Sequence, residues 1–169
     1  MVPPILPNAL ASPHAPHWSS AGMPDLNPTA GICSLLQFQG IQHPWLERTT
    51  QRCWQILFEA LPREAYTLLS ATYLAEYHPD PLLAERISEK IAASLREARF
   101  FIPYAPVREY GLTPLHFART PSSRCRRLFS DEQIDGHLDD LLQKQQPDGG
   151  WPTSWELPGP AAACEWRGR

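Results

Sequence analysis

Apolar residues recur along this chain at the spacing of α-helices, and the helical segments alternate between two kinds. Segments 28–39 and 63–77 carry no charge in their interiors, which predicts helices that are buried on most sides. Segments 44–60 and 81–98 carry an apolar stripe on one face and charges on the other, which predicts surface helices. Helices of the same kind begin roughly 35 residues apart, so the pattern predicts stacked helical hairpins in an all-α fold.

Residues with known capping roles mark the ends of these helices. Asn27 is a good N-cap acceptor at the start of the first helix, and Gly40 is placed to end it. Ser130 and Gln133 form a capping box that begins a further helix at 131–145. We expect the two uncharged helices to bury Leu35 and Leu69, and the last helix to bury the stripe Ile134, Leu138, Leu141 and Leu142.

Two segments lack helical periodicity and are rich in proline. Residues 1–26 form a Pro-rich N-terminal arm, and residues 27–169 form the helical-hairpin domain. Within that domain a break at 100–129 combines proline, aromatic residues and arginine, and loops of this length are usually functional or disordered. We expect a solvated loop rather than a phosphate site around its three clustered arginines, which are Arg124, Arg126 and Arg127.

Composition excludes two classes of function. The chain has 169 residues and a formal net charge of -3, with no cluster of Lys and Arg large enough to bind nucleic acid. No apolar run reaches the roughly 18 residues that a membrane-spanning helix needs. The first residues lack the features of a secretion signal, and the cysteines form no C-x-x-C pair, so we expect reduced thiols in a cytoplasmic protein. The cysteines are Cys33, Cys53, Cys125 and Cys164.

A short unit directly after the last helix carries the most specific pattern in the chain. Gly149 and Gly150 permit backbone angles that reverse the chain tightly, and Asp148 is placed to cap amides in that turn. Gln145 can bond to carbonyl groups at the end of its own helix. Trp151 then offers a large apolar face. The unit therefore predicts a staple between neighbouring hairpins.

This unit resembles the repeat of the α/α-toroid superfamily, which includes terpenoid cyclases of the squalene–hopene type and β subunits of protein prenyltransferases. In that repeat a Gln at the end of an outer helix is followed by a turn of the form G-x-W, and Gln145, Gly149 and Trp151 occupy those positions. The resemblance extends over residues 27–155 and implies an all-α fold whose stacked helical hairpins form a partial α/α toroid. The chain holds fewer hairpins than a closed ring of that superfamily.

The resemblance implies a domain that binds an isoprenoid-like apolar ligand, with aromatic side chains as the walls of its cavity. Whether the domain is an isoprenoid cyclase, a prenyl transferase or no enzyme stays open, because no complete catalytic set is visible; no cofactor is implied. The alternative is a non-catalytic helical-repeat scaffold that binds another protein. The candidate ligand-binding residues are Trp18, Tyr104, Tyr110 and Trp155.

Charged and metal-ligating residues give weaker signals. Asp139 and Asp140 are similar to the start of the aspartate-rich motif of terpene synthases, but Gln143 stands in place of its next aspartate. Both lie on the polar side of the predicted helix, so we expect a solvated acidic face. His14 and His17 could supply two metal ligands, but histidines in a Pro-rich arm are more often polar loop residues, so we expect no metal site.

An incomplete ring leaves apolar faces at its two ends. Exposed apolar patches above a few hundred Å² rarely persist on soluble monomers. We expect the arm 1–26 and the loop 100–129 to fold over these faces, with Trp18 and Phe101 as the main covers. Self-association, or hairpins contributed by a longer natural chain, would serve the same purpose.

Overall fold

The computed structural model describes residues 25–152, and in this part of the chain the fold is all-α. Isolated bridges occur between extended residues, but the described residues form no strand. No helix among them is long and apolar enough to cross a bilayer. The five predicted helices agree with α1 to α4 and α6 to within a few residues. The elements are α1 (Leu26–Phe38), α2 (Pro44–Glu59), α3 (Ala65–Glu76), α4 (Pro81–Leu95), α5 (Pro114–Phe117), the 3-10 helix η3 (Arg124–Leu128) and α6 (Asp131–Lys144).

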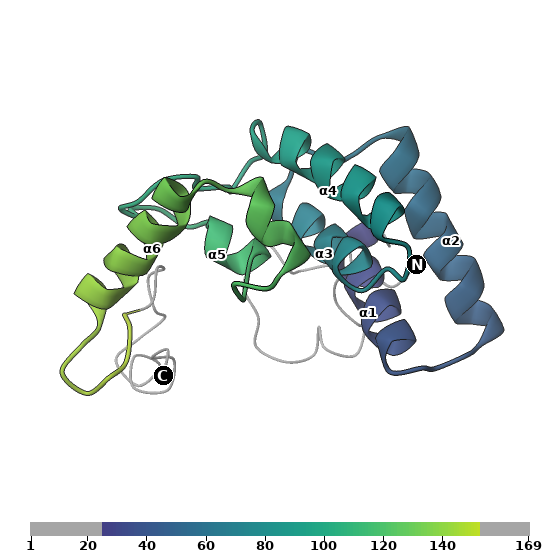
Figure 1. Ribbon diagram of the computed structural model, residues 1–169, viewed down its shortest axis with the longest axis horizontal. Coiled ribbons are helices and arrows are strands. Elements are labelled where there is room, and N and C mark those ends of the chain that lie inside the picture. The colour runs from purple at the N-terminus through teal and green to yellow at the C-terminus, as the bar shows by residue number, and fades with distance from the viewer. Residues whose placement is uncertain (1–24, 153–169) are drawn as a thin grey trace, which may run out of the picture.

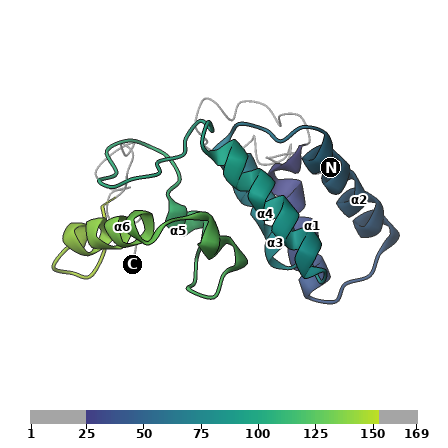
Figure 2. The same ribbon diagram turned by 45° about the horizontal axis from the view of Figure 1, so that its top comes forward.

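Helices α1 to α4 form one body made of two helical hairpins (Figure 1 and Figure 2). α1 and α3 pack side by side, α2 packs on α1, and α4 packs on α3. Asn27 at the start of α1 is hydrogen-bonded to Ser70 in the middle of α3, and the ring of Phe38 at the end of α1 contacts that of Tyr77 at the end of α3, so the two helices run in the same direction. The hairpins therefore stack in the order that the alternating pattern predicts.

Side chains from the preceding loops cap the helices of this body. Glu64 caps α3 and Asp80 caps α4, each by accepting hydrogen bonds from backbone N–H groups of the first turn. Asp25 caps the start of α1, and Asn27 follows with extended backbone angles (φ −94°, ψ 118°), so the regular turns begin at Pro28 as predicted, but the side chain of Asn27 makes a different contact from the predicted cap. Asn27 instead accepts a 3.0 Å hydrogen bond from the hydroxyl of Ser70, so its side chain ties α1 to α3.

The burial of α1 differs from the prediction on one face. Gly40 ends the helix as expected, with a φ of 73°. Leu69 of α3 is half-buried, but Leu35 is 43% exposed and Phe38 is 63% exposed, so the prediction that Leu35 is buried is wrong. The reason is that α1 has helical neighbours on two sides only, α2 and α3. Among the described residues, its remaining side stays open.

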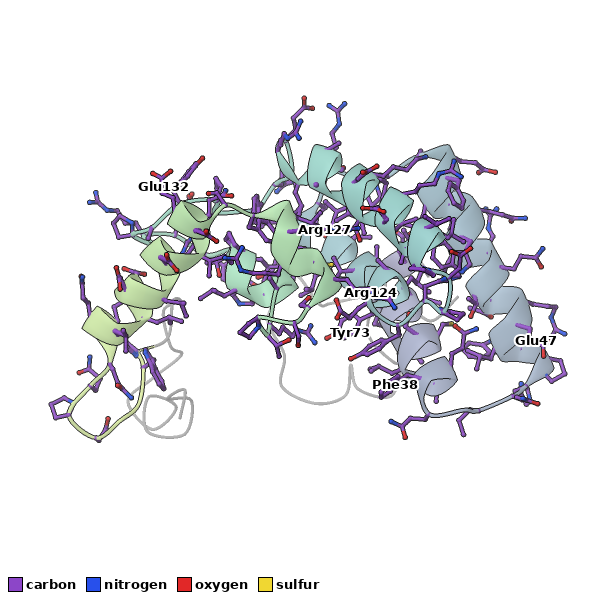
Figure 3. The ribbon with its side chains drawn as sticks, viewed as in Figure 1. Phe38, Glu47, Tyr73, Arg124, Arg127 and Glu132 are labelled. Atoms are coloured by element: carbon purple, nitrogen blue, oxygen red, sulfur yellow. The ribbon has the colours of Figure 1, made fainter. Side chains whose placement is uncertain are left out.

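The segment 100–129 packs against the two hairpins and contains α5 and η3. η3 lies against α3 and α4, and Arg124 reaches from it to donate hydrogen bonds to the carbonyl groups of Ala75 and His78 (Figure 3). In return, the carboxylate of Glu76 accepts a 2.8 Å hydrogen bond from the hydroxyl of Ser123 and further bonds from the N–H of Arg124. These bonds fix η3 to the C-terminal end of α3.

The other arginines of this segment are also engaged by protein groups. Arg127 forms a 2.7 Å ion pair with Glu85 of α4 (Figure 3). Arg126 donates to the carbonyl of Phe129 and pairs with the carboxylate of Asp131. Arg124 and Arg127 are exposed, as expected of a solvated loop, and Arg126 is half-buried, but each guanidinium group is also bonded to a protein group.

Helix α6 lies at the end of the molecule away from α1 and α2 (Figure 1). α5 connects it to the hairpins, since α5 contacts α3 and also packs on α6. Phe117 of α5 contacts the rings of Phe101 and Phe129, with centroids 5.7 and 6.1 Å away. Phe101 thus packs on the apolar core, its role as a cover of an open hairpin face stays a prediction, and Trp18 lies outside the described residues.

Glu76→Ala should lower the free energy of unfolding by about 1.5–3 kcal/mol, the range for losing hydrogen bonds to a charged group. Loss of the carboxylate removes the bonds that hold η3 to α3. Urea denaturation followed by circular dichroism measures the change. Glu59→Ala, at the exposed end of α2, is the matched control and should change stability by less than about 0.5 kcal/mol. Equal effects of the two variants would contradict this account of η3.

Candidate functional site

The segment after α6 forms a tight turn held by its own side chains. Gly149 has a φ of 83°, a left-handed conformation that favours glycine. The side-chain amide of Gln145 donates a 3.1 Å hydrogen bond to the carbonyl of Gly149. The N–H of Gly150 donates to the carboxylate of Asp148, also at 3.1 Å. Gln145 and Asp148 therefore stabilise the turn, while the role of this turn as a repeat unit stays a prediction.

Trp151 packs on the helix that precedes it. Its indole N–H donates a 2.8 Å hydrogen bond to the carbonyl of Leu141 in the last turns of α6, and its side chain is half-buried. Together with residues 107–116 it forms part of the wall of a cavity. Within the described residues Trp151 thus contacts α6 and this cavity, and the staple between two hairpins stays a prediction.

Helix α6 buries a different face from the one that its leucines predict. Ile134 is buried as expected, but it shares the buried face with His137, 2% exposed, and Asp140, 8% exposed. This face is rotated from the predicted stripe by about 100°, the turn of one residue in an α-helix. Asp139 is exposed, but the expectation of a solvated Asp140 is wrong. The prediction that three leucines are buried is also wrong, because Leu138, Leu141 and Leu142 are exposed by 45%, 42% and 69%.

A cavity of about 370 Å³, here named the α6 cavity, lies between this helix and the loop that leads into α5. Polar side chains from three elements line it together with apolar ones. Gly111 forms part of the wall. The position favours glycine, since a Cβ there would lie only 2.8 Å from the carbonyl oxygen of Phe100. The lining residues are Val107, Gly111, Thr113, Leu115, His116, His137, Asp140, Leu141, Lys144, Trp151 and Pro152.

An ion pair closes one side of the α6 cavity. The ammonium group of Lys144 lies 2.7 Å from the Oδ2 atom of Asp140, one helical turn earlier, and 2.9 Å from the carbonyl of Val107. The N–H of Val107 donates to the same Oδ2 atom at 3.3 Å. Burial alone would raise the pKa of Asp140, but the hydrogen bonds from Lys144 and Val107 outweigh it and hold the pKa below its usual value.

Two histidines complete the polar part of the α6 cavity. Burial lowers the pKa of His137, although the carbonyl groups of Pro103 and Ile102 oppose this shift, and its Nε2 atom is buried without a hydrogen-bond partner among residues 25–152. His116 accepts a 3.0 Å hydrogen bond at Nδ1 from the N–H of Thr113, and partial burial lowers its pKa as well. Both rings are therefore neutral near pH 7.

A second cavity, here named the aromatic cavity, has a volume of about 360 Å³ and lies among α1, α2 and the end of α3. The rings of Phe38 and Tyr77 lie 4.6 Å apart, centroid to centroid, and those of Trp54 and His78 lie 5.0 Å apart. Figure 3 labels Phe38 at the end of α1 and Tyr73 of α3, and the ring of Tyr77 contacts both of these rings. The cavity is lined by Ser34, Gln37, Phe38, Thr50, Trp54, Leu74, Tyr77, His78 and Pro79.

Of the ligand-binding residues predicted from the sequence, the two that the structure describes, Tyr104 and Tyr110, line neither cavity. Tyr104 is 56% exposed. Tyr110 is 51% exposed and stacks on Tyr66 at 5.8 Å. Trp18 and Trp155 lie outside the described residues, as do the weak metal candidates His14 and His17. Among the residues that are described, no three His, Cys, Asp or Glu side chains are grouped so as to hold a metal ion.

The described cysteines are buried thiols, as expected. Cys33 of α1 and Cys53 of α2 are hydrogen-bonded to each other. The bond from Cys53 is the main reason why the pKa of Cys33 falls to about 7, whereas the pKa of Cys53 is raised by the same bond and by burial. Burial raises the pKa of Cys125 to about 11. Cys164 lies outside the described residues.

Apolar periodicity singles out neither His116 nor His137 as a site residue, although signals for both exist in the chain. Ile134, His137 and Asp140 recur at a spacing of three residues, which places them on one helical face. The string Thr113-Pro114 before His116 is a helix start with a side chain at the third position that can bond back to the cap. Apolar periodicity alone gives no weight to either signal.

Trp151→Ala should lower the free energy of unfolding by about 1.5–3 kcal/mol, less than the 3–5 kcal/mol of a fully buried aromatic side chain, because Trp151 is only half-buried. Trp151→Phe keeps the ring and loses the bond to Leu141, so it should cost about 1 kcal/mol. Thermal unfolding measures both. Leu142→Ala, at an exposed position of the same helix, should change stability by less than about 0.5 kcal/mol. A loss that small for Trp151→Ala would show that the indole does not hold the turn.

Comparison with protein-family models, with curated proteins and with solved structures gives no match for this chain. The likeness of Gln145, Gly149 and Trp151 to the toroid repeat therefore rests on the sequence pattern. The candidate sites rest on the geometry described above.

Proposed function

We propose that this chain is a toroid-like helical-hairpin domain, related in architecture to terpenoid cyclases and prenyltransferases, that binds an isoprenoid-like apolar molecule. The observation that carries this proposal is the aromatic cavity, whose walls come from both hairpins. Its volume of about 360 Å³ lies at the small end of the range for ligand sites in proteins.

The walls of the aromatic cavity suit an apolar chain. Phe38 and Tyr77 support each other on one side, and Trp54 and His78 do so in a T-shaped arrangement. Rings held by mutual contact lose little conformational entropy on binding, so they offer apolar area at low cost. Leu74 adds a buried aliphatic surface between α3 and the cavity.

The arrangement of the helices supports the toroid-like part of the proposal. In a toroid, one helix of each hairpin faces the ring interior, and these inner helices are neighbours. Here α1 and α3 are parallel neighbours, and the short α5 contacts α3 and packs on α6. We infer that α5 and α6 are a reduced third hairpin, with α5 in the inner position.

Binding is proposed rather than a defined reaction, because of the residues around the aromatic cavity. The part of its lining that the structure describes contains no carboxylate and no lysine or arginine. The hydroxyl of Ser34 donates its hydrogen to the carbonyl of Ala30 within the same helix, so this hydrogen is used in a structural hydrogen bond. The described lining therefore offers surface and polar contacts to a ligand, without a general acid for cyclisation.

One surface favours the scaffold function as a second candidate. Leu138, Leu141 and Leu142 form an exposed leucine face on α6. Exposed apolar faces on helices of repeat proteins bind partner chains. A partner on this face would cover the apolar area that the described residues leave open.

Farnesol, an isoprenoid alcohol, should bind to the protein, and Phe38→Ala should weaken that binding about tenfold, equivalent to about 1.4 kcal/mol. Phe38 is a wall of the aromatic cavity and is 63% exposed, so its removal should leave the fold intact. Isothermal titration calorimetry at two temperatures measures the affinity and the negative heat-capacity change of apolar burial. Tyr104→Ala removes an exposed aromatic residue outside the cavity and should leave the affinity unchanged. Absence of binding, or equal losses in both variants, would overturn the proposal.

Leu138→Lys combined with Leu142→Lys should abolish any association of the protein with itself through the leucine face. Both side chains are exposed, so lysine is accommodated without loss of the fold. Sedimentation velocity over a range of concentrations measures the association. Leu82→Lys on α4, where the leucine is 71% exposed, is the matched control and should associate like the unchanged protein. A protein that stays monomeric at all concentrations would contradict self-association through this face.

A further inference from the structure

We propose that the α6 cavity is a binding site for a neutral, polyhydroxylated ring, either a sugar or a cyclic polyol. The site is separate from the aromatic cavity, and no lining residue is shared between them. His137, His116 and the pair of Asp140 and Lys144 supply its polar contacts, and Trp151 supplies an apolar wall.

The buried Nε2 atom of His137 is the observation that points to a ligand. The side chain lines the α6 cavity and is only 2% exposed, and no described residue gives its Nε2 atom a hydrogen-bond partner. The backbone carbonyl groups of Pro103 and Ile102 lie near this ring. In either tautomer of the neutral ring, Nε2 is then a buried donor or acceptor without a partner among these residues, which costs free energy until a group such as a hydroxyl meets it.

The charges around the α6 cavity favour a neutral ligand. The positive charge of Lys144 and the negative charge of Asp140 cancel within a 2.7 Å ion pair. A charged ligand would have to compete with that pair, and neither histidine adds a charge near pH 7. The described lining therefore offers no net charge to an anion or a cation.

The polar groups of the site include both donors and acceptors. Nε2 of His137 donates or accepts according to the tautomer of the ring, whereas His116 accepts at Nδ1 from Thr113 and so carries its ring proton on Nε2 as a donor. Lys144 is a further donor, and Asp140 is an acceptor whose hydrogen bonds from Val107 and Lys144 both end on Oδ2. Hydroxyl groups donate and accept at once, so a ligand with several hydroxyls matches this mixture.

The apolar wall favours a ring rather than an open chain. The indole of Trp151 is fixed by its 2.8 Å bond to the carbonyl of Leu141, and its side chain is half-buried at the edge of the cavity. Val107 and Leu115 add aliphatic surface from the facing loop. A flat, rigid aromatic face packs well against the C–H face of a saturated ring.

The test uses the full chain labelled with ¹⁵N and a panel of defined probes. The neutral probes are methyl β-D-glucopyranoside, methyl α-D-mannopyranoside and myo-inositol, and the charged probes are glucuronate and glucosamine. Long-range ¹H–¹⁵N spectra of the imidazole rings report whether Nε2 of His137 gains a hydrogen bond during titration into the millimolar range. We expect the His137 signal to shift with at least one neutral probe and to shift less with both charged probes.

The neutral probes distinguish a sugar from a cyclic polyol as the ligand. A response to a glycoside but not to myo-inositol assigns a sugar, and the reverse assigns a cyclic polyol. A His137 signal that no probe moves would show that Nε2 is met by water only, and it would overturn the proposal. Stronger binding of glucuronate or glucosamine than of the neutral probes would overturn it too.

Variants link the response to the α6 cavity. Trp151→Leu should weaken probe binding at least about tenfold. His137→Gln should assign the imidazole signal and remove the response; if this buried change unfolds the protein, Trp151→Leu alone decides. Leu138→Ala, an exposed position of the same helix outside the cavity, should bind like the unchanged protein. Phe38→Ala should also leave probe binding unchanged, so the outcome is independent of the aromatic cavity; equal binding by Trp151→Leu and the unchanged protein would overturn the proposal.

Discussion

The close contact of α1 with α3 is the interaction on which the other elements depend. α1 buries Ala30, Gly31 and Ser34, and α3 buries Ser70 and Ala71, so both helices present small residues. Small residues let two helix backbones approach closely, and the approach fixes where longer neighbours pack. A Cβ on Gly31 would already lie 3.6 Å from the ring of Tyr73. α2, α4 and η3 then pack around this pair and complete the core.

The sequence predicts the two hairpins well because their helices obey one simple rule. In α2 and α4 the apolar stripe faces the neighbouring helix, and Cys53, Leu57, Ile87 and Ile91 are buried as their spacing requires. The same rule fails for Leu35, which lies on the side of α1 that has no helical neighbour among the described residues. Periodicity shows which face of a helix is apolar. Whether another helix packs on that face depends on the tertiary structure.

α6 shows why the candidate site could not be predicted from the same rule. The face that α6 turns toward the protein is set by two hydrogen bonds to a loop. The N–H of Val107 donates to Asp140, and the side chain of Gln133 donates to the carbonyl of Pro103. These partners lie about 30 residues away in the sequence and in no regular element. His137 is buried because it lies on the face of α6 that these bonds hold against the loop. Helix boundaries, by contrast, depend on local caps such as Ser130, which the sequence does predict.

The rotation of α6 has a consequence for how the molecule is layered. One long side of the helix contacts the loop and the cavity, while Leu138 and Leu142, about a third of a turn further round, are exposed. A helix with two such sides has the character of a middle layer, which contacts different parts of a structure on each side. Protein packed on Leu138 and Leu142, which do not line the cavity, would leave the groups around His137 in place. A ligand in the α6 cavity and further protein packed on the outer side of α6 would therefore not clash with each other.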